Sequence, residues 1–302
     1  MSVKAIVSCC VCHYPDLGRT SAVPRVGSPT NAFKMLLVLS SIFFAVFSTE
    51  FVRIRACTTL AVGRKATTDG SVMSTHSNDG GGTTDPRLIR IPARDYLNSS
   101  RNHLYKYLSH LIFFISLLLY LQQAVRPIYA SPEGYPRYVG TERGAVEYYS
   151  ENCQAGKVNC VDFQPMGYIP QVNHTYAYLE DTYGALNEMQ VGIAESTCSG
   201  VYASRSIADG GKALLSIDQL SQIAMERAKT AKEAVSLMGQ LGEQYGFYGE
   251  SASFEGGSES LIVTDPQEAW VFHILADPTG ASAIWGAARV PDDSVAVVWQ
   301  QP

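Results

Sequence analysis

Cys57 is the residue whose type and surroundings most directly suggest chemistry. It opens the stretch CTTLAVGRKATTDGSVMSTHSND, residues 57–79, shortly after an apolar run. If the chain is cut between Ala56 and Cys57, the new α-amino group, with a pKa near ~8, would lie beside the thiol of the same residue. That amine can accept the thiol proton and so activate the sulfur without a separate histidine. The alternative is a small residue buried at the start of a strand.

An acidic residue is expected to return towards Cys57 along a hairpin. The stretch after Cys57 is rich in Thr, Leu and Val, Asp69-Gly70 favours a two-residue hairpin turn, and residues 71–79 have the pattern of the returning strand. Asp79 would then lie near the free end of the first strand, where its carboxylate can hold an ammonium group. The alternative for Asp79 is a surface carboxylate at the end of a hairpin.

The composition limits the functional classes. The chain has 302 residues, 46% of them hydrophobic, a net charge of −5 and no sustained basic run, so nucleic acid and anionic membrane surfaces are not expected partners. Seven cysteines are too few, and odd in number, for a disulfide scaffold. Cys9 and Cys12 have CxxC spacing without a second ligand pair, which favours a leader over a zinc site. Cys198 is expected as a core thiol, and neither a metal nor a cofactor is predicted.

Two apolar segments bear on targeting. Residues 34–48, KMLLVLSSIFFAVFS, resemble a secretory signal sequence, with Met35 as an alternative start. Residues 107–125 are open to three interpretations: a buried helix, a membrane anchor through Leu108–Leu121, or a segment foreign to the fold. Ile54 and Arg55 make Ala56 a poor signal-peptidase site, so self-processing or another protease would cut there. The expected location is the secretory pathway, with the protein secreted or endolysosomal, or membrane-associated.

The remaining sequence predicts strands, then two helices, then strands again, which is an α+β arrangement. Ser216–Gln219 and Thr230–Glu233 are capping boxes, and Gly246 is a helix C-cap signal. The stripe that repeats at helical spacing in the second helix is expected to pack on a sheet. It consists of Ala234, Leu237, Met238 and Leu241. In the strand region before the helices, YGALNEMQ is expected as a break between strands, and TDPQ is expected as a turn after them.

The stretch at Cys57 resembles the cysteine dipeptidases of the N-terminal nucleophile hydrolases, relatives of dipeptidase A and secernin. The resemblance continues through DPRLIRIPARD, RPIYASPEGYPRYVGTERG, GYIPQVNHTYAYLEDTYGALNEMQVGIAESTCSG and AARVPDDSVAVV. It implies a four-layer αββα sandwich of antiparallel sheets and hydrolysis of short peptides through a thioester. It also implies a leader over residues 1–56 and the hydrolase domain over residues 57–302.

The resemblance implies roles for particular residues. Cys57 would be the nucleophile and its amine the base, while Asp79 occupies the place of the family's amine-orienting aspartate. Asn187 lies where related acylases place an oxyanion-hole asparagine, a contribution worth roughly 3–4 kcal/mol; its alternative is a turn residue. His76 stands where those acylases carry an arginine.

The sequence departs from the family pattern in two places. Residues 96–125 look like an insertion, either a retained intron or a genuine anchor or lid. The chain also ends soon after VPDDSVAVV, where relatives continue and supply a further asparagine and arginine, so the fold and site are expected to be incomplete. Two alternatives to a dipeptidase stay open: a catalytically degenerate, secretory or membrane-tethered secernin-like protein, and an amide acylase of the penicillin V acylase type.

Overall fold

The computed structural model describes part of the chain, all of it in one compact unit that comprises Met1–Cys12 and Ala56–Gln301. The described residues are 4–9, 57–77, 87–96, 124–129, 138–139, 143–144, 148–149, 165–181, 183–198, 200, 202–249 and 257–299. Asp79, residues 34–48, and most of residues 107–125 and of the expected insertion 96–125 lie outside these ranges. Within them, no helix has the length and apolar character needed to cross a bilayer.

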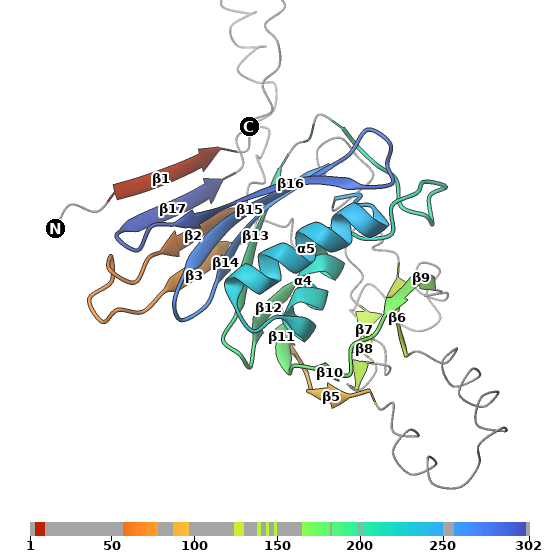
Figure 1. Ribbon diagram of the computed structural model, residues 1–302, viewed down its shortest axis with the longest axis horizontal. Helices are drawn as coiled ribbons and strands as arrows, with labels where there is room; N and C mark the ends of the chain where they lie inside the picture. Colours follow the sequence, from red (N-terminus) through yellow and green to blue (C-terminus); the bar gives the residue numbers. More distant parts are fainter. Residues whose placement is uncertain are drawn as a thin grey trace, which may run out of the picture. The chain divides into compact units, whose positions relative to one another are not determined.

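A seven-stranded antiparallel sheet forms the centre of the described structure (Figure 1). Two helices, α4 (Ile217–Arg227) and α5 (Ala231–Tyr245), pack against strands of this sheet. The apolar cluster between them accounts for most of the fully buried large side chains. In order across the sheet, the strands are β16 (Ala283–Val290), β15 (Ala269–Ala276), β14 (Ser258–Thr264), β13 (Gly192–Cys198), β12 (Gly184–Asn187), β11 (Tyr178–Glu180) and β4 (Ile89–Ile91).

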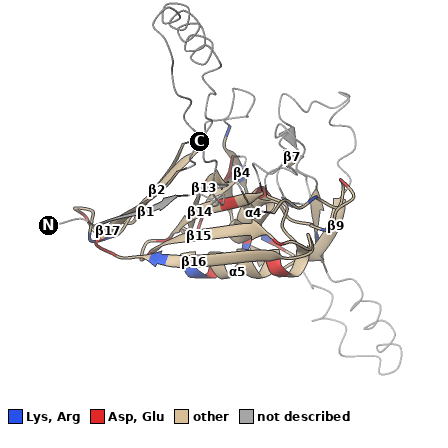
Figure 2. Cartoon of the chain, turned by 90° about the horizontal axis from the view of Figure 1, so that it is seen from above, with Lys and Arg blue, Asp and Glu red and all other residues tan. Residues whose placement is uncertain are grey.

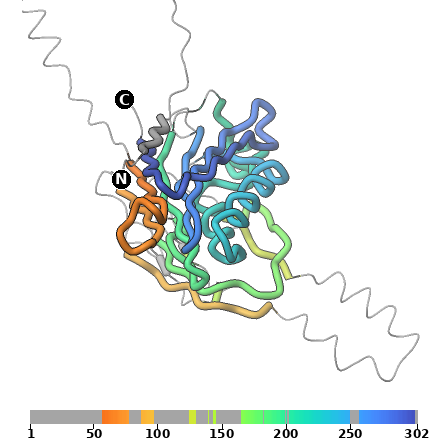
Figure 3. Tube along the Cα trace, turned by 60° about the vertical axis from the view of Figure 1, so that its left-hand side comes forward, coloured from red at the N-terminus to blue at the C-terminus, as the bar shows by residue number. Residues whose placement is uncertain are grey.

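A second sheet of four strands packs on the first, with β2 and β3 against β13 and β14. Its strands, in order, are β1 (Lys4–Cys9), β17 (Ser294–Trp299), β2 (Thr58–Val62) and β3 (Met73–Ser77). The first pair is parallel and the other two are antiparallel. Figure 3 shows the orange β2–β3 segment beside the dark blue C-terminal strand. Lys4–Cys9, expected in an unstructured leader, forms the edge strand of this sheet.

Three short strand pairs complete the described elements. They are β5 (Arg94–Asp95) with β10 (His174–Thr175), β6 (Val125–Tyr129) with β9 (Pro165–Pro170), and β7 (Tyr138–Val139) with β8 (Tyr148–Tyr149). In Figure 2, the central strands are mostly tan, so few of their residues are charged. This agrees with strands that are covered on both faces. The α+β class is therefore confirmed. The described residues form one helical layer and two sheets, and the fourth layer of the expected sandwich is not seen among them.

The helix predictions hold well, because their signals are local. The Gln219 side chain accepts from the Ser216 N–H at 3.0 Å, as a capping box requires. Thr230 Oγ1 accepts from the Glu233 N–H at 3.2 Å, but the Glu233 carboxylate accepts from Lys229 instead of Thr230, so the second capping box is only half formed. Gly246 ends α5 with a φ of 76°. The predicted stripe of α5 packs on β15 and β16.

Two turn predictions are wrong in detail. The β2–β3 hairpin closes through the longer loop of residues 63–72, in which Asp69 Oδ1 accepts from the backbone and hydroxyl of Ser71, and not through a two-residue turn. The pairing of β2 with β3 ends at Val62 and Met73. Beyond it, the N–H groups of Gly63 and Lys65 donate to the carbonyls of Ser294, at the start of β17, and of Asp292, in the β16–β17 turn. In YGALNEMQ, Gly184–Asn187 is itself strand β12, and the turn occupies the residues that follow.

A buried cluster of charges ties the segment around β6 to the helical layer. Arg126 of β6 forms a two-pronged ion pair with Glu226 of α4, with N–O distances of 2.8 and 2.9 Å. Arg143 bonds to Glu180 of β11, and its Nε lies 3.8 Å from Glu226 Oε1. The Tyr178 hydroxyl lies between the two pairs, 3.1 Å from Glu180 Oε2, to which it donates, and 3.5 Å from Glu226 Oε1. The sequence analysis did not predict this cluster.

Candidate active site

Cys57 lies immediately before β2 and is held in place through its backbone. Its carbonyl accepts a hydrogen bond from Ser196 Oγ of β13 at 2.9 Å, and the next N–H, that of Thr58, donates to Ser77 Oγ of β3 at 3.0 Å. The side chain is partly buried, and the sulfur is not in a disulfide. The start of β2 is thus fastened to strands of both sheets, which fixes the position from which the thiol extends.

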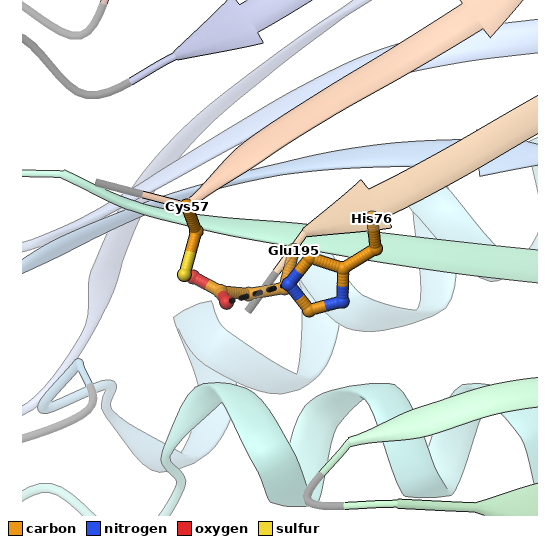
Figure 4. A group of neighbouring side chains, drawn as sticks. All are labelled: Cys57, His76 and Glu195. Atoms are coloured by element: carbon orange, nitrogen blue, oxygen red, sulfur yellow. Dashed lines mark ion pairs between the residues drawn. The ribbon is translucent and has the colours of Figure 1, made fainter. Parts of the chain in front are cut away.

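Two further side chains converge on the Cys57 thiol, as Figure 4 shows. They are His76 of β3 and Glu195 of β13, and one ligating atom of each of the three residues lies within 4.8 Å of the other two. His76 Nε2 and Glu195 Oε2 are 3.8 Å apart. The β2–β3 ladder pairs Thr59 with His76, so the hairpin brings the histidine back beside the start of β2.

Glu195 is the one charged residue of β13, whose sequence is GIAESTC. Its side chain is fully buried, and its Oε1 accepts from Thr197 Oγ1 at 3.0 Å. The β12–β13 ladder consists of the single pair Leu186–Gly192, so β12 no longer pairs with β13 at the position of Glu195. The Glu195 carboxylate therefore lies in the protein interior next to the Cys57 thiol. A buried charge without a compensating partner costs free energy.

Two polar atoms of this cluster have unfilled hydrogen-bonding capacity. His76 Nε2 and Glu195 Oε2 are both buried, and neither has a hydrogen-bond partner among the residues that the structure describes. Their 3.8 Å separation is too long for a hydrogen bond. Buried polar atoms are nearly always satisfied, so this pair marks a place for a group that completes the site.

The surroundings of the cluster favour positive charge. Burial raises the pKa of the Tyr183 hydroxyl well above its usual value, and the negative charges of Glu195, Glu259 and Cys57 raise it further. The Tyr183 ring lies 6.1 Å from the ring of His76. A neutral phenol and the buried Glu195 carboxylate beside the Cys57 thiol make a site that attracts cations or ammonium groups.

A groove of about 490 Å³ lies beside the cluster, between β3 and strands of the central sheet. Its lining includes His76, Ser74, Gln190 and Asp265 but neither Cys57 nor Glu195. This volume falls in the range of small-ligand pockets. His76 is the residue common to the groove and the thiol cluster, and so connects the two.

Asn187 does not join the cluster through any of its four side-chain hydrogen bonds. Its amide group donates to the carbonyls of Met225 and Ala228 at 3.0 and 2.8 Å, while Oδ1 accepts from the N–H groups of Met189 and Val191. The side chain thus fastens the β12–β13 turn to the end of α4. To donate to an oxyanion it would have to give up one of these bonds, and that role stays a prediction. So does the role of Asp79, which lies outside the described residues.

The sequence analysis missed Glu195 and left His76 without a role. The available signal for Glu195 was a lone carboxylate inside the buried-strand pattern VGIAEST. Cys198 was expected as a core thiol, which is wrong because it is disulfide-bonded. The cysteine on the other side of that bond is not among those whose side chains the structure describes.

One comparison with known proteins bears on the activity of this chain. The model of peptidase family C69 matches residues 166–301, which run from β9 to the end of β17. The matched segment contains Glu195 and both helices, while Cys57 and His76 precede it. The match supports peptidase, and hence hydrolase, activity. Over residues 166–301, the chain is thus similar to peptidase family C69, the family of cysteine dipeptidases related to dipeptidase A and secernin.

Proposed function

We propose that this protein is a dipeptidase that hydrolyses short peptides through nucleophilic attack by the Cys57 sulfur. The observation that carries the proposal is the meeting of Cys57 with His76 and Glu195 in a chain that contains a peptidase family C69 segment. A thiol beside a histidine and a buried carboxylate is the side-chain set that cysteine hydrolases use.

The proposed reaction proceeds in two stages. The Cys57 thiolate attacks the peptide carbonyl carbon, the tetrahedral intermediate collapses to a thioester, and the second amino acid leaves as an amine after taking up a proton. Water then attacks the thioester, which releases the first amino acid as a carboxylate and restores the thiol. The buried Glu195 carboxylate beside Cys57 suits a substrate with a free α-ammonium group.

Two groups can take the proton from the thiol. If the residues before Cys57 are removed, its own α-amino group is the base, and this is the mechanism we propose. His76 is the rival base, because its ring nitrogen lies within 4.8 Å of the sulfur without any processing. The two mechanisms differ in whether the active protein must begin at Cys57.

The test combines N-terminal sequencing of the active protein with dipeptide hydrolysis assays. We expect a mature chain that begins at Cys57, and a loss of kcat/KM of roughly 10⁴-fold or more in Cys57→Ala. His174→Gln is the matched control, because this histidine is half-exposed and pairs with Asp95 away from the cluster. Activity in a protein that retains residues before Cys57 would exclude the α-amine as the base.

Other outcomes separate the alternatives. Cleavage of non-peptide amides without cleavage of dipeptides would identify an acylase. A folded protein that begins at Cys57 and hydrolyses neither kind of substrate would support a catalytically degenerate member of the family.

A further inference from the structure

We propose that Cys57, His76 and Glu195 form a binding site for a zinc-class divalent cation, and that the bound cation blocks the Cys57 thiol. The binding claim stands on the geometry of the three side chains alone. The inhibition claim rests on the proposed peptidase function.

The ligand set fits zinc in type. Thiolate, imidazole and carboxylate are the ligands that zinc takes in proteins, whereas magnesium and calcium prefer oxygen alone. Three protein ligands also leave a fourth coordination position open for water or a substrate group. The three residues come from the start of β2, from β3 and from β13, which are rigid elements joined by backbone pairing.

The distances fit as well. In a tetrahedral zinc site with bonds of about 2.0–2.3 Å, ligand atoms lie roughly 3.3–3.6 Å from one another. His76 Nε2 and Glu195 Oε2 are 3.8 Å apart, and no pair in the trio exceeds 4.8 Å. Side-chain rotations that move the ligating atoms by about an ångström are therefore enough to bring all three within bonding distance of one ion.

The unfilled hydrogen-bonding capacity points to a ligand at this position. His76 Nε2 and Glu195 Oε2 are the ligating atoms that face each other, and both are buried without a hydrogen-bond partner among the described residues. A cation between them would satisfy both atoms and neutralise the buried carboxylate. Thr197 donates to the other oxygen of Glu195, which orients the carboxylate in the way that outer hydrogen bonds orient metal ligands.

Binding has a defined chemical consequence. The thiol of Cys57 loses its proton to solvent as the sulfur–metal bond forms, so affinity falls as the pH is lowered. The metal-bound sulfur can no longer attack a carbonyl carbon. Peptidase activity would therefore be reversibly inhibited by zinc and restored by a chelator.

The binding test is cobalt titration of the full-length, reduced, metal-free protein, followed by visible absorption. We expect one tetrahedral cobalt site per chain with a thiolate-to-cobalt band, displaced by zinc. Cys57→Ser should abolish the band, and His76→Gln and Glu195→Gln should each weaken binding by at least about tenfold. His174→Gln should bind as the unmodified protein does.

A second control removes Cys9 and Cys12, which have CxxC spacing. Cys9→Ser combined with Cys12→Ser leaves the proposed site intact, so the thiolate band should persist. Circular dichroism of each variant checks that it is folded. Binding that survives in Cys57→Ser, or that disappears in the Cys9/Cys12 double variant alone, would overturn the proposal.

The two proposals can fail separately. Cobalt binding by a protein without hydrolase activity would leave the metal site standing and remove the proposed function. Hydrolase activity that zinc does not inhibit, in a protein that gives no cobalt band, would leave the proposed function standing and remove the metal site.

Discussion

Replacing Glu226 by glutamine tests the buried charge cluster that attaches β6 to the helical layer. The substitution keeps the size of the side chain but removes the charge that faces Arg126 at 2.8 and 2.9 Å and Arg143 at 3.8 Å. The Arg126 and Glu226 side chains are each only 5% exposed. Two buried guanidinium groups would then have one fewer counter-charge than they need.

The expected loss is large because the pair is buried. Removing one partner of a buried ion pair typically costs about 3–5 kcal/mol, whereas an exposed pair contributes about 0–1 kcal/mol. The matched control is Glu268→Gln, since Glu268 pairs with Arg289 at 2.8 Å at the surface. Urea unfolding at neutral pH should show a much lower midpoint for Glu226→Gln than for Glu268→Gln, with a similar slope.

The same pair predicts how stability depends on pH. Burial alone would raise the pKa of Glu226, but the charges of Arg126 and Arg143 and the hydrogen bonds from Arg126 lower it below its usual 4.5 in the folded protein. The contribution of this carboxylate is therefore complete above its unfolded pKa and is lost as the pH falls through the folded pKa. Glu226→Gln should show a shallower loss of stability in acid. If the two glutamine variants unfold at the same urea concentration, the cluster does not stabilise the fold as argued.

Two further substitutions test the packing around the site. Asn187→Ala should lower the free energy of unfolding by about 3 kcal/mol, because it leaves the buried carbonyls of Met225 and Ala228 without their donors; urea unfolding measures this, and a loss below about 1 kcal/mol would contradict it. Gly239→Ala should destabilise α5 by about 1–3 kcal/mol, because the new methyl group would overlap the Trp285 ring. Thermal unfolding with tryptophan fluorescence follows this change, and an unshifted spectrum with an unchanged Tm would show that the ring is not in the way.

Local signals account for what could be predicted of the fold. The capping residues of α4 and α5 act over three positions, and β14 and β15 are apolar runs on either side of a turn, so their patterns are visible along the chain. Turn geometry was less predictable. Asp69-Gly70 has the composition of a tight hairpin turn, but the backbone of Gly63 and Lys65 bonds to Ser294 of β17 and to Asp292 of the β16–β17 turn, and the loop is longer.

The candidate site was predictable only in part. The position of Cys57 at the start of a strand, and the return of His76 along the paired strand, follow from the hairpin pattern. The contribution of Glu195 could not be derived in this way. Ser196, its neighbour, meets Cys57 across 139 residues of sequence, a contact that depends on how two sheets pack.

The sequence by itself determined the α+β class, the two helices and the main strands, and it singled out Cys57 as the candidate thiol, because each depends on residues close together in the chain. The tertiary structure alone decided which groups surround that thiol. Strand pairing and sheet packing placed a buried carboxylate and an imidazole beside Cys57, and they joined Arg126 to Glu226 across 100 residues. Charges are buried in a protein only where folding supplies their partners, and a one-dimensional pattern does not contain those partners.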